Sequence, residues 1–413
     1  MVTYPSSWPQ CQFGAIVDKI EAGVSVRSYD SLTALPAVLK TSALVNGRFD
    51  CTQRKSIVAE DLLRARIKVK PDSLLISRMN TPALVGMVCY VSHAPESVFL
   101  PDRIWRVQGK RVNLQWLGYM LSSTALSSQI RELATGTSGS MKNIPKQRLL
   151  EMMVPTPLLT EQRAIAGVLS GFDDHLANLD ELIAKKKAIR DGALEELITG
   201  RTRIADYIDP WVTRSAKELL TDVITGGTPS TAIDEYWNGS IPWLSSTEIH
   251  QRMVSRPTRS ISEEGLENSS AQIAPAGSVL IALAGQGKTR GTSAFLTRDM
   301  ALNQSLAGLV VNETKLHREY LLYMLIHRYE DLRGLSSGDG GRGGLNKTLL
   351  WNLWFTLPSD LHEQCAIAEV LLGMDQEIRL VEEERAKVER LKSGAMDDLL
   401  TGRVRIPIEE EVA

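Results

Sequence analysis

Residues 282–289 read ALAGQGKT and follow SVLI at 278–281, a run expected to form a strand. A small residue, four further residues and then Gly-Lys-Thr is the loose form of a phosphate-binding loop. Such a loop needs a helix directly after it, because the amides of the helix N-terminus face the phosphates. The residues that follow, RGTSAFLT, instead favour a turn into another strand. Nucleotide hydrolysis is therefore a minor alternative, and we expect a hairpin tip that carries Gln286, Lys288 and Arg290 outward.

Other catalytic signatures are missing from the sequence. It contains no NPPY or DPPY tetrapeptide for amino methylation, no HExxH and no GxSxG. The six histidines are scattered, and the four cysteines lie far apart without a CxxC pair, so neither a metal cluster nor a disulfide framework is indicated. We therefore expect a non-catalytic chain with no metal site and no cofactor of its own.

The composition predicts a cytoplasmic, soluble protein of two or three domains. The chain has 413 residues, 43% hydrophobic and 23% charged. It has neither an apolar run of about eighteen residues nor a signal-peptide pattern, so no membrane association is expected. Residues 1–155 carry 19 basic and 11 acidic side chains, a net charge of +8, whereas residues 359–413 carry 7 and 14, a net charge of −7. A basic first third suits a polyanionic partner.

The chain repeats itself. Residues 160–204 align without a gap with residues 362–406, and about twenty of the last forty-four positions are identical. Apolar residues recur at steps of three and four in both copies, which predicts two long helices of roughly 50 Å. A helix with a narrow apolar stripe needs a partner, and the other copy is the economical one. Gly200 and Gly402 occupy the positions of C-terminal glycine caps. The stripe residues are Ile165, Val168, Leu169, Phe172, Leu176, Leu179 and Ile183 in the first copy, and Ile367, Val370, Leu371, Met374, Ile378 and Val381 in the second.

A fainter repeat joins the segments before each helix. Trp8 matches Trp211, Gly23 matches Gly226, and residues 72–91 align with residues 277–296. Short strands such as SLLIS and VLIAL, glycine-rich loops and helical stretches such as LQWLGYMLSS indicate mixed α and β structure. The fold class is therefore α+β, with two globular units and two long helices in a tandem repeat.

The repeat supplies further candidate residues for binding nucleic acid. Arg and Lys bind guanine or phosphate, and Asn and Gln pair with adenine. The segment equivalent to the hairpin tip offers Arg78, Asn80 and Thr81. The glycine-rich segments 135–144 and 337–346 resemble each other, and with the residue that follows the second segment they bring Lys142, Asn143, Arg342, Asn346 and Lys347. The alternative for each of these residues is that it lies in an ordinary solvent-exposed turn and binds nothing.

Three phrases resemble the specificity (S) subunits of type I restriction–modification systems. They are GGTPSTAIDEYWNGSIPWLSSTEI at 226–249, the EQ-x-AIA openings of both long helices, each shortly after a proline, and LITGRTRI and LLTGRVRI at their ends. The resemblance covers essentially the whole chain. Within the first phrase, Gly226, Gly227, Thr228 and Ser230 resemble the family's loop, whereas Tyr236, Trp237 and Trp243 are equally explained as core aromatic residues. The first unit departs from this pattern, since it has EAGVSVRSYD where the second has the GGTPS phrase.

The resemblance implies a division of labour along the chain. Residues 1–157 and 205–359 would be target recognition domains, each binding one half of a split site in double-stranded DNA. Residues 158–204 and 360–413, the latter with an acidic tail, would form an antiparallel coiled-coil spacer with pseudo-twofold symmetry. Two methyltransferase (M) subunits would dock on the repeats and restriction/motor (R) subunits would join them. S-adenosylmethionine, ATP and Mg would belong to those partners.

Two other functions are also compatible with the sequence. The helix pair could be a scaffold whose globular units bind proteins rather than DNA, in which case DNA would not bind at all. A phosphate-loop NTPase is less favoured and would require that Lys288→Ala abolish ATP binding. The bases that are recognised, the length of the spacer and the presence of a nuclease partner do not follow from the sequence.

Overall fold

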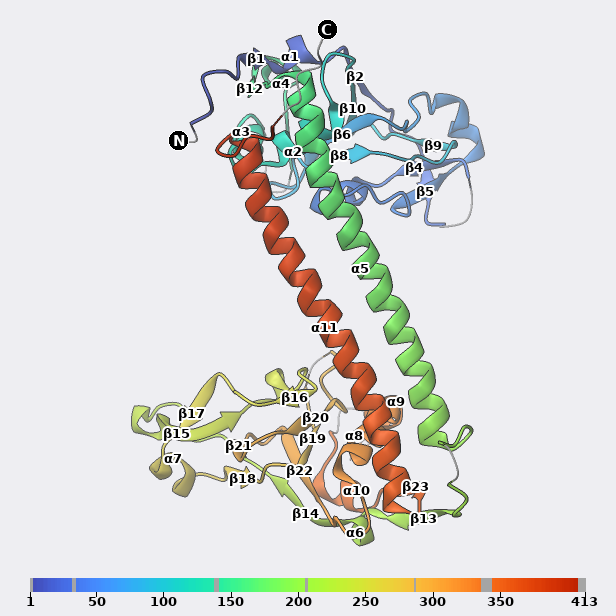
Figure 1. Ribbon diagram of the computed structural model, residues 1–413, viewed down its shortest axis with the longest axis vertical. Helices are drawn as coiled ribbons and strands as arrows, with labels where there is room; N and C mark the ends of the chain where they lie inside the picture. The colour runs from blue at the N-terminus through green and yellow to red at the C-terminus, as the bar shows by residue number, and fades with distance from the viewer. Residues whose placement is uncertain are drawn as a thin grey trace. The chain divides into compact units, whose positions relative to one another are not determined.

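The computed structural model describes residues 3–31, 35–136, 141–204, 207–285, 287–335 and 344–407. The chain divides into two compact units: unit 1 is Met1–Asp180 with Glu383–Ala413, and unit 2 is Glu181–Glu382. Both long helices, α5 (Leu159–Thr199) and α11 (Leu361–Leu400), continue across this division. Each unit therefore contains one globular part and a portion of both helices (Figure 1).

The two predicted long helices are confirmed, with 41 residues in α5 and 40 in α11. α5 ends directly before the predicted Gly200 and α11 ends two positions before the predicted Gly402. Both glycines have φ of +71°, the left-handed conformation that ends a helix without a Cβ penalty. A Cβ at Gly200 would lie 3.2 Å from the Trp211 ring, and one at Gly402 would lie 3.3 Å from the Trp8 ring. The two matched tryptophans therefore occupy the same place beside their helix ends.

The apolar stripes of the two helices are largely buried, as predicted, but one valine in each helix is exposed. Leu169 and Leu371 are fully buried, whereas Val168 and Val370 are exposed. Neighbouring residues on a helix lie about 100° apart, so both members of such a pair cannot face one seam. The two valines therefore contribute to the outer face of the helices in both copies.

Within unit 1 the two helix portions run antiparallel. Asp173 of α5 binds Lys392 of α11, and Asp180, about two turns further along α5, binds Arg385. Residue numbers thus rise along α5 as they fall along α11. The pairs Lys186–Glu377 and Arg190–Asp375 repeat this order within unit 2.

Unit 1 contains two four-stranded sheets, with strand orders β2–β10–β6–β8 and β3–β5–β4–β9. The first sheet consists of β2 (Lys19–Ala22), β10 (Ile104–Gln108), β6 (Ser73–Ser77) and β8 (Val88–Val91), and the second of β3 (Ser28–Tyr29), β5 (Arg54–Ile57), β4 (Ala37–Leu39) and β9 (Val98–Phe99). Two short ribbons pair β1 (Gln10–Gln12) with β12 (Met153–Pro155), and β7 (Met79–Asn80) with β11 (Lys142–Asn143). The shorter helices are α1 (Phe13–Ile16), α2 (Leu114–Ser122), α3 (Thr124–Glu132), α4 (Lys146–Glu151), η1 (Thr41–Gly47) and η2 (Ala59–Arg64).

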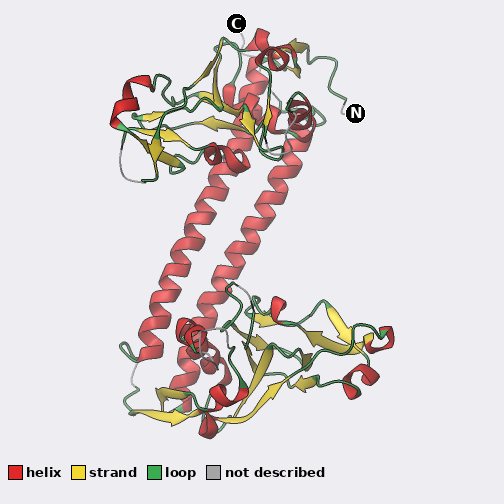
Figure 2. Ribbon diagram, turned by 180° about the vertical axis from the view of Figure 1, so that it is seen from behind, coloured by secondary structure: helices red, strands yellow, loops and turns green. Residues whose placement is uncertain are grey.

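Unit 2 repeats this plan in its described residues, with five strands in its first sheet and one ribbon in place of two. Its first sheet has the order β14–β22–β19–β20–β16 and its second the order β17–β15–β21–β18. These strands are β14 (Leu220–Thr225), β22 (Leu306–Val311), β19 (Val279–Ala282), β20 (Ser293–Leu296), β16 (Met253–Val254), β17 (Arg259–Ile261), β15 (Trp237–Leu244), β21 (Met300–Leu302) and β18 (Gln272–Ala274). A ribbon pairs β13 (Trp211–Ser215) with β23 (Trp354–Pro358). The shorter helices are α6 (Ala216–Leu219), α7 (Glu263–Glu267), α8 (Arg318–His327), α9 (Tyr329–Gly334), α10 (Lys347–Trp351), η3 (Asp234–Tyr236) and η4 (Ser246–Glu248). In Figure 2 the strands of each unit gather in its globular part.

The faint sequence repeat between the globular parts corresponds to a close structural one. A Cβ at Gly23 would lie 1.7 Å from the carbonyl oxygen of Leu100, and a Cβ at Gly226 would lie 1.7 Å from that of Leu302. No side chain fits at either position, so glycine is required by the same backbone approach in both units.

The EQ and TGR-x-RI phrases of the repeat bind each other. In unit 1 the buried Glu161 at the start of α5 accepts hydrogen bonds from Arg405, which follows α11, and from the Trp8 indole at 3.2 Å. Its neighbour Gln162 accepts the backbone N–H of Asn113 at 2.8 Å, where α2 begins. Unit 2 repeats these bonds with Arg203 on Glu363 and Gln364 on the backbone N–H of His317. In each unit these two phrases therefore bind the start of one long helix to the segment after the other and to the globular part.

Candidate nucleic-acid interface

Three loops of unit 2 leave its first sheet at one edge. Thr225 of β14 pairs with Ala307 of β22, and Ala282 of β19 pairs with Leu306 of the same strand. Because these pairs are adjacent, the loop after β14, the turn before β22 and the hairpin after β19 all start at this edge. Thr228 Oγ1 donates to Gln304 Oε1 at 2.5 Å, which joins the first loop to the turn. The edge thus collects several of the predicted DNA-binding residues.

The Gly226–Ser230 loop is held by the aromatic residues of its own sequence phrase. Trp243 is buried and its indole N–H donates to the carbonyl of Gly227 at 3.0 Å. Trp237 donates in the same way to the carbonyl of Ser230 at 3.1 Å. A Cβ at Gly227 would lie 2.0 Å from Ser270 Oγ, so this glycine, like Gly226, is needed for packing. Thr228 and Ser230 are the exposed hydroxyl residues that this arrangement presents.

The segment ALAGQGKT is a hairpin connection, as predicted. Strand β20 pairs antiparallel with β19 directly after it, so a strand stands where a phosphate-binding loop would need a helix. Lys288 is exposed, and its backbone carbonyl accepts the Tyr329 hydroxyl at 2.7 Å. Arg290 was expected to point outward, but its guanidinium donates to the carbonyl of Arg333 at 2.6 Å and it is only partly exposed. Gln286 lies outside the described residues.

The second glycine-rich segment contributes at its end. The Asn346 side chain caps α10 by accepting the N–H of Leu349 at 2.8 Å, so its oxygen is already used. Lys347 is exposed and lies 3.6 Å from Asp222. The N–H of Leu345 donates to the carbonyl of Leu283, which places this segment beside the hairpin. Arg342 lies outside the described residues.

In unit 1 the five predicted residues come together although two segments of the chain supply them. Lys142 pairs with Asn80 in the β7–β11 ribbon. Arg78 Nε donates to Asn143 Oδ1 at 3.4 Å, and Lys142 Nζ donates to the carbonyl of Gly136 at 2.8 Å. Thr81, which follows the ribbon, is exposed. Two cations and two amides therefore lie on one short ribbon at the end of β6.

The charge pattern of these loops suits polyanion binding. Among the described residues, no group of three or more His, Cys, Asp or Glu side chains could hold a metal ion. Within that same part of the chain, none of the helices has the length and apolarity that a membrane crossing requires. Cations, amides and hydroxyls are the groups that contact phosphates and base edges.

A model of the type I restriction modification DNA specificity domain matches residues 59–187 and 208–390. The chain belongs to this family. The match occurs twice, once in each half of the repeat, and together the two matches cover most of the chain. The resemblance inferred from the EQ, TGR-x-RI and GGTPS phrases is thereby confirmed.

Individual specificity subunits agree with this assignment. The chain is 24% identical over 304 residues to the type I restriction enzyme MjaVIII specificity subunit of Methanocaldococcus jannaschii, with 70% of each chain covered. It is 30% identical over 153 residues to the EcoR124I/EcoR124II specificity subunit of Escherichia coli, with 36% of this chain and 37% of the other covered. A crystal structure of the S subunit of a type I restriction–modification system from M. genitalium superposes with a TM-score of 0.64 at 15% identity over 95% of this chain and 96% of the other. The fold class is confirmed, and the chain is a non-catalytic DNA specificity subunit.

Sequence reasoning missed two polar residues of this specificity subunit's second unit. Gln304 bonds Thr228, and the Arg259 guanidinium lies 3.6 Å from the centre of the Trp237 ring, which itself holds the Gly226–Ser230 loop. Gln304 follows Asn303 in a turn at the end of a strand, and because both amides can pair with adenine, the sequence could have indicated Gln304 as a candidate. Arg259 carried no such signal, because its partner lies 22 positions earlier in the chain.

Proposed function

We propose that this specificity subunit reads a bipartite target in double-stranded DNA and docks two methyltransferase (M) subunits. Residues 1–157 and 205–359 are the two target recognition domains, and residues 158–204 and 360–413 are the spacer helices and the acidic tail. Each domain reads one half-site, and because the two domains differ in sequence, the half-sites differ. Restriction/motor (R) subunits join through the methyltransferase core.

The duplicated loop edge supports the DNA-reading half of this proposal. Both units place cations and amides where the first sheet ends, on the β7–β11 ribbon in unit 1 and around the β19–β20 hairpin in unit 2. Exposed lysines such as Lys288 and Lys347 suit phosphates, whereas Arg78 and Asn80 suit base edges. The proposed DNA-contacting set remains Arg78, Asn80, Thr81, Lys142, Asn143, Gly226, Gly227, Thr228, Ser230, Gln286, Lys288, Arg290, Arg342, Asn346 and Lys347. Within it, Gly226 and Gly227 act by allowing close packing of the loop.

Duplicated apolar positions on the helices support two docking sites. Val168 and Val370 occupy equivalent positions and are 42% and 39% exposed, and Ile189 and Leu391 are likewise equivalent and 54% and 53% exposed. Each unit contains one valine of the first pair and one aliphatic residue of the second. Exposed aliphatic side chains repeated at the same positions fit a partner that binds twice in the same way.

The chemistry of the complex belongs to its partners. S-adenosylmethionine would be bound by the methyltransferase subunits, and ATP and Mg by the motor subunits. This chain contributes the choice of sequence, and it acts in the cytoplasm, where the DNA is.

The proposal is tested by co-expressing the full chain with its methyltransferase partner and mapping methylated adenines on genomic DNA. The expected result is a single motif with two unlike halves separated by unread bases. The partner-free chain should bind DNA with an affinity that falls steeply with salt and should transfer no methyl group. A scaffold for proteins would give no DNA binding at any salt concentration, and methyl transfer by the chain alone would contradict a non-catalytic role.

A further inference from the structure

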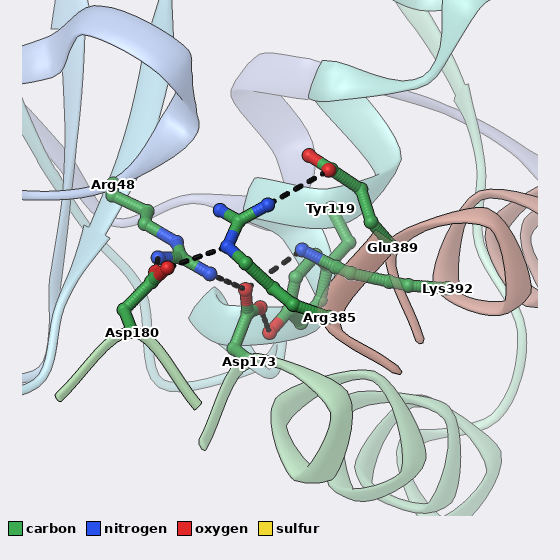
Figure 3. Close-up of polar contacts among 7 residues, drawn as sticks. All are labelled: Arg48, Tyr119, Asp173, Asp180, Arg385, Glu389 and Lys392. Carbon is green, nitrogen blue, oxygen red and sulfur yellow. Dashed lines mark hydrogen bonds and ion pairs between the residues drawn. The ribbon is translucent and has the colours of Figure 1, made fainter. Parts of the chain in front are cut away.

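The carboxylate of Asp173 in α5 is contacted by side chains from three other parts of unit 1 (Figure 3). The Tyr119 hydroxyl of α2 donates to Oδ2 at 2.7 Å, and Lys392 Nζ of α11 donates to Oδ1 at 2.8 Å. Arg48, which follows η1, approaches Oδ1 at 3.6 Å with Nη2. Burial and the bond to Asp173 raise the pKa of Tyr119, so its hydroxyl keeps the proton that it donates.

Unit 2 contains the same constellation around Asp375 of α11. The Tyr323 hydroxyl of α8 donates to Oδ2 at 2.8 Å, and Arg190 Nη1 of α5 lies 3.4 Å from Oδ1. Arg252 Nη1, just before β16, lies 3.4 Å from Oδ2. The acid, the tyrosine, the cation on the other long helix and the arginine from the globular part therefore each have a counterpart.

The two arginines come from equivalent connections, although the sequences around them differ. Arg48 lies in NGRFD between β4 and β5, and Arg252 lies in HQRMV between β15 and β17. Strands β4 and β15 each pair in parallel with a later strand, β9 or β21, so both connections leave the second sheet at the same step of the fold. Two unlike segments bring an arginine to the same acid, which sequence similarity does not explain.

In each constellation the arginine comes from a connection between strands of the second sheet, β4 and β5 in unit 1 and β15 and β17 in unit 2. In unit 2 this connection also contains β16 of the first sheet, and the carbonyl of Arg252 accepts the N–H of Phe295 in β20. The tyrosines belong to α2 and α8, which already share a core with the long helices: Trp116 and Leu117 of α2 pack with Ile165 and Leu169 of α5. The Leu44 cluster joins the second sheet of unit 1 to the first, since it contains Leu39 of β4 with Leu75 of β6 and Ile104 of β10, and a smaller cluster surrounds Val38. Neither cluster contains a residue of the long helices, so Arg48 is a direct polar contact that bears on the angle between this sheet and those helices.

Arg48 holds this angle at two points. Its Nη1 lies 3.5 Å from Oδ2 of Asp180, which is seven positions and about 10 Å further along α5. Asp180 also accepts a hydrogen bond from Arg385 of α11, and Glu389 binds the same Arg385 at 3.0 Å (Figure 3). A guanidinium spread over two turns resists rotation about the contact more than a single ion pair would.

We propose that Arg48 and Arg252 are positioning residues for DNA recognition. Through Asp173 and Asp375, they tie the connection that leaves the second sheet of each recognition domain to the helix pair, and so hold the domain at a fixed angle to the helices. This inference rests on the proposed bipartite reading, in which that angle limits the half-site separations that the subunit accepts. Loss of either arginine broadens the accepted spacer while leaving the bases read in each half-site unchanged.

The test uses the full chain with its methyltransferase partner and substrates that keep both half-sites while the spacer varies one base pair at a time. Arg48→Met and Arg252→Met remove the charge and keep an unbranched side chain. Each should raise methylation of the neighbouring spacers relative to the native one by about twofold to fivefold, the range of a partly exposed ion pair. The double variant should combine both effects, since the sites lie in separate units.

Two further variants separate positioning from general weakening. Arg48→Lys keeps a cation within reach and should restore most of the discrimination. Lys186→Met removes the 2.7 Å pair with Glu377 between the long helices, which reaches no recognition domain, and should leave spacer choice as it was. Thermal unfolding of every variant reports whether the fold is intact.

Several outcomes would overturn the proposal. Unchanged spacer discrimination in both methionine variants would do so, and so would equal relaxation in Lys186→Met. If Arg48→Met does not fold, the wild type decides: raising NaCl from about 50 mM to about 300 mM screens the half-exposed Arg48 and should relax discrimination, whereas constant discrimination rejects the idea. A wild type that methylates no bipartite motif would instead reject the proposed function itself.

Discussion

Lengthening both spacer helices by one turn should move the two half-sites apart without changing either one. The antiparallel register indicates where to insert. Residue numbers add up to 565 in the pairs Asp173–Lys392 and Asp180–Arg385 of unit 1, and in Arg190–Asp375 of unit 2. Four residues placed between positions 182 and 183 and four between positions 382 and 383 therefore preserve every such pair.

The size of the effect follows from helix and duplex geometry. Four residues extend each helix by about 6 Å and turn it by about 400°, close to a whole turn, so the apolar stripe keeps its direction. Duplex DNA advances about 3.4 Å per base pair, so the unread spacer should grow by one or two base pairs. The extra base pairs also add a twist of roughly 35–70°, which DNA or the domain joints must absorb, so weaker binding is expected as well.

The assay is methylation mapping of genomic DNA in cells that express the lengthened chain and its methyltransferase partner. The matched control inserts two residues at each position, which turns the helices by about 200° and should disrupt their packing. If the four-residue variant methylates the original motif with the original spacing, the helices do not set the spacing. The methyltransferase partners would then have to set it.

Three smaller changes test other parts of the reasoning. Lys288→Ala should weaken DNA binding across all sequences and lower the salt slope by about one, and an unchanged slope in a salt titration would remove Lys288 from the interface. Arg405→Ala leaves the buried Glu161 carboxylate without its cation and should cost on the order of 3 kcal/mol of unfolding free energy, to be measured by denaturation. A cost as small as that of a surface ion pair would show that the Glu161–Arg405 pair is dispensable for stability. The hydrogen bond from Arg385 lowers the pKa of Asp180. The stability that this bond adds is therefore present above the ordinary carboxyl pKa of about 3.9 and is lost as pH falls through the lowered value. Asp180→Asn should flatten the acid limb of a plot of thermal stability against pH, and an unaltered limb would argue against the contact.

The repeat made much of this fold predictable from sequence. Two copies of one helix, each ending in a glycine before Arg-x-Arg, predicted both long helices and their caps at Gly200 and Gly402. The same alignment removed the phosphate-loop interpretation of ALAGQGKT, because its counterpart in the first unit has no Gly-Lys-Thr. Comparison within the chain therefore carried more information than any single motif.

Contacts between segments that are distant along the chain could not be predicted from the sequence. The stripe pattern placed Val168 and Val370 inside, because spacing alone does not tell which of two adjacent apolar residues faces the partner helix. Arg290 was expected on the outer surface, but a carbonyl 43 positions away accepts its guanidinium. The Asp173 and Asp375 constellations were hidden for the same reason, since Arg48 and Arg252 lie in segments that do not align.

A chain carrying the same recognition domain twice tests the assignment of one half-site to each unit. Residues 205–359 are replaced by residues 1–157, the two long helices are kept, and methylated adenines are mapped after co-expression with the methyltransferase partner. Because the repeat is pseudo-twofold, the expected motif consists of two inverted copies of the first half-site, and its spacer is that of the native motif. A motif that still contained the second half-site, or that lost both halves while the protein stayed folded and bound its partner, would contradict the assignment.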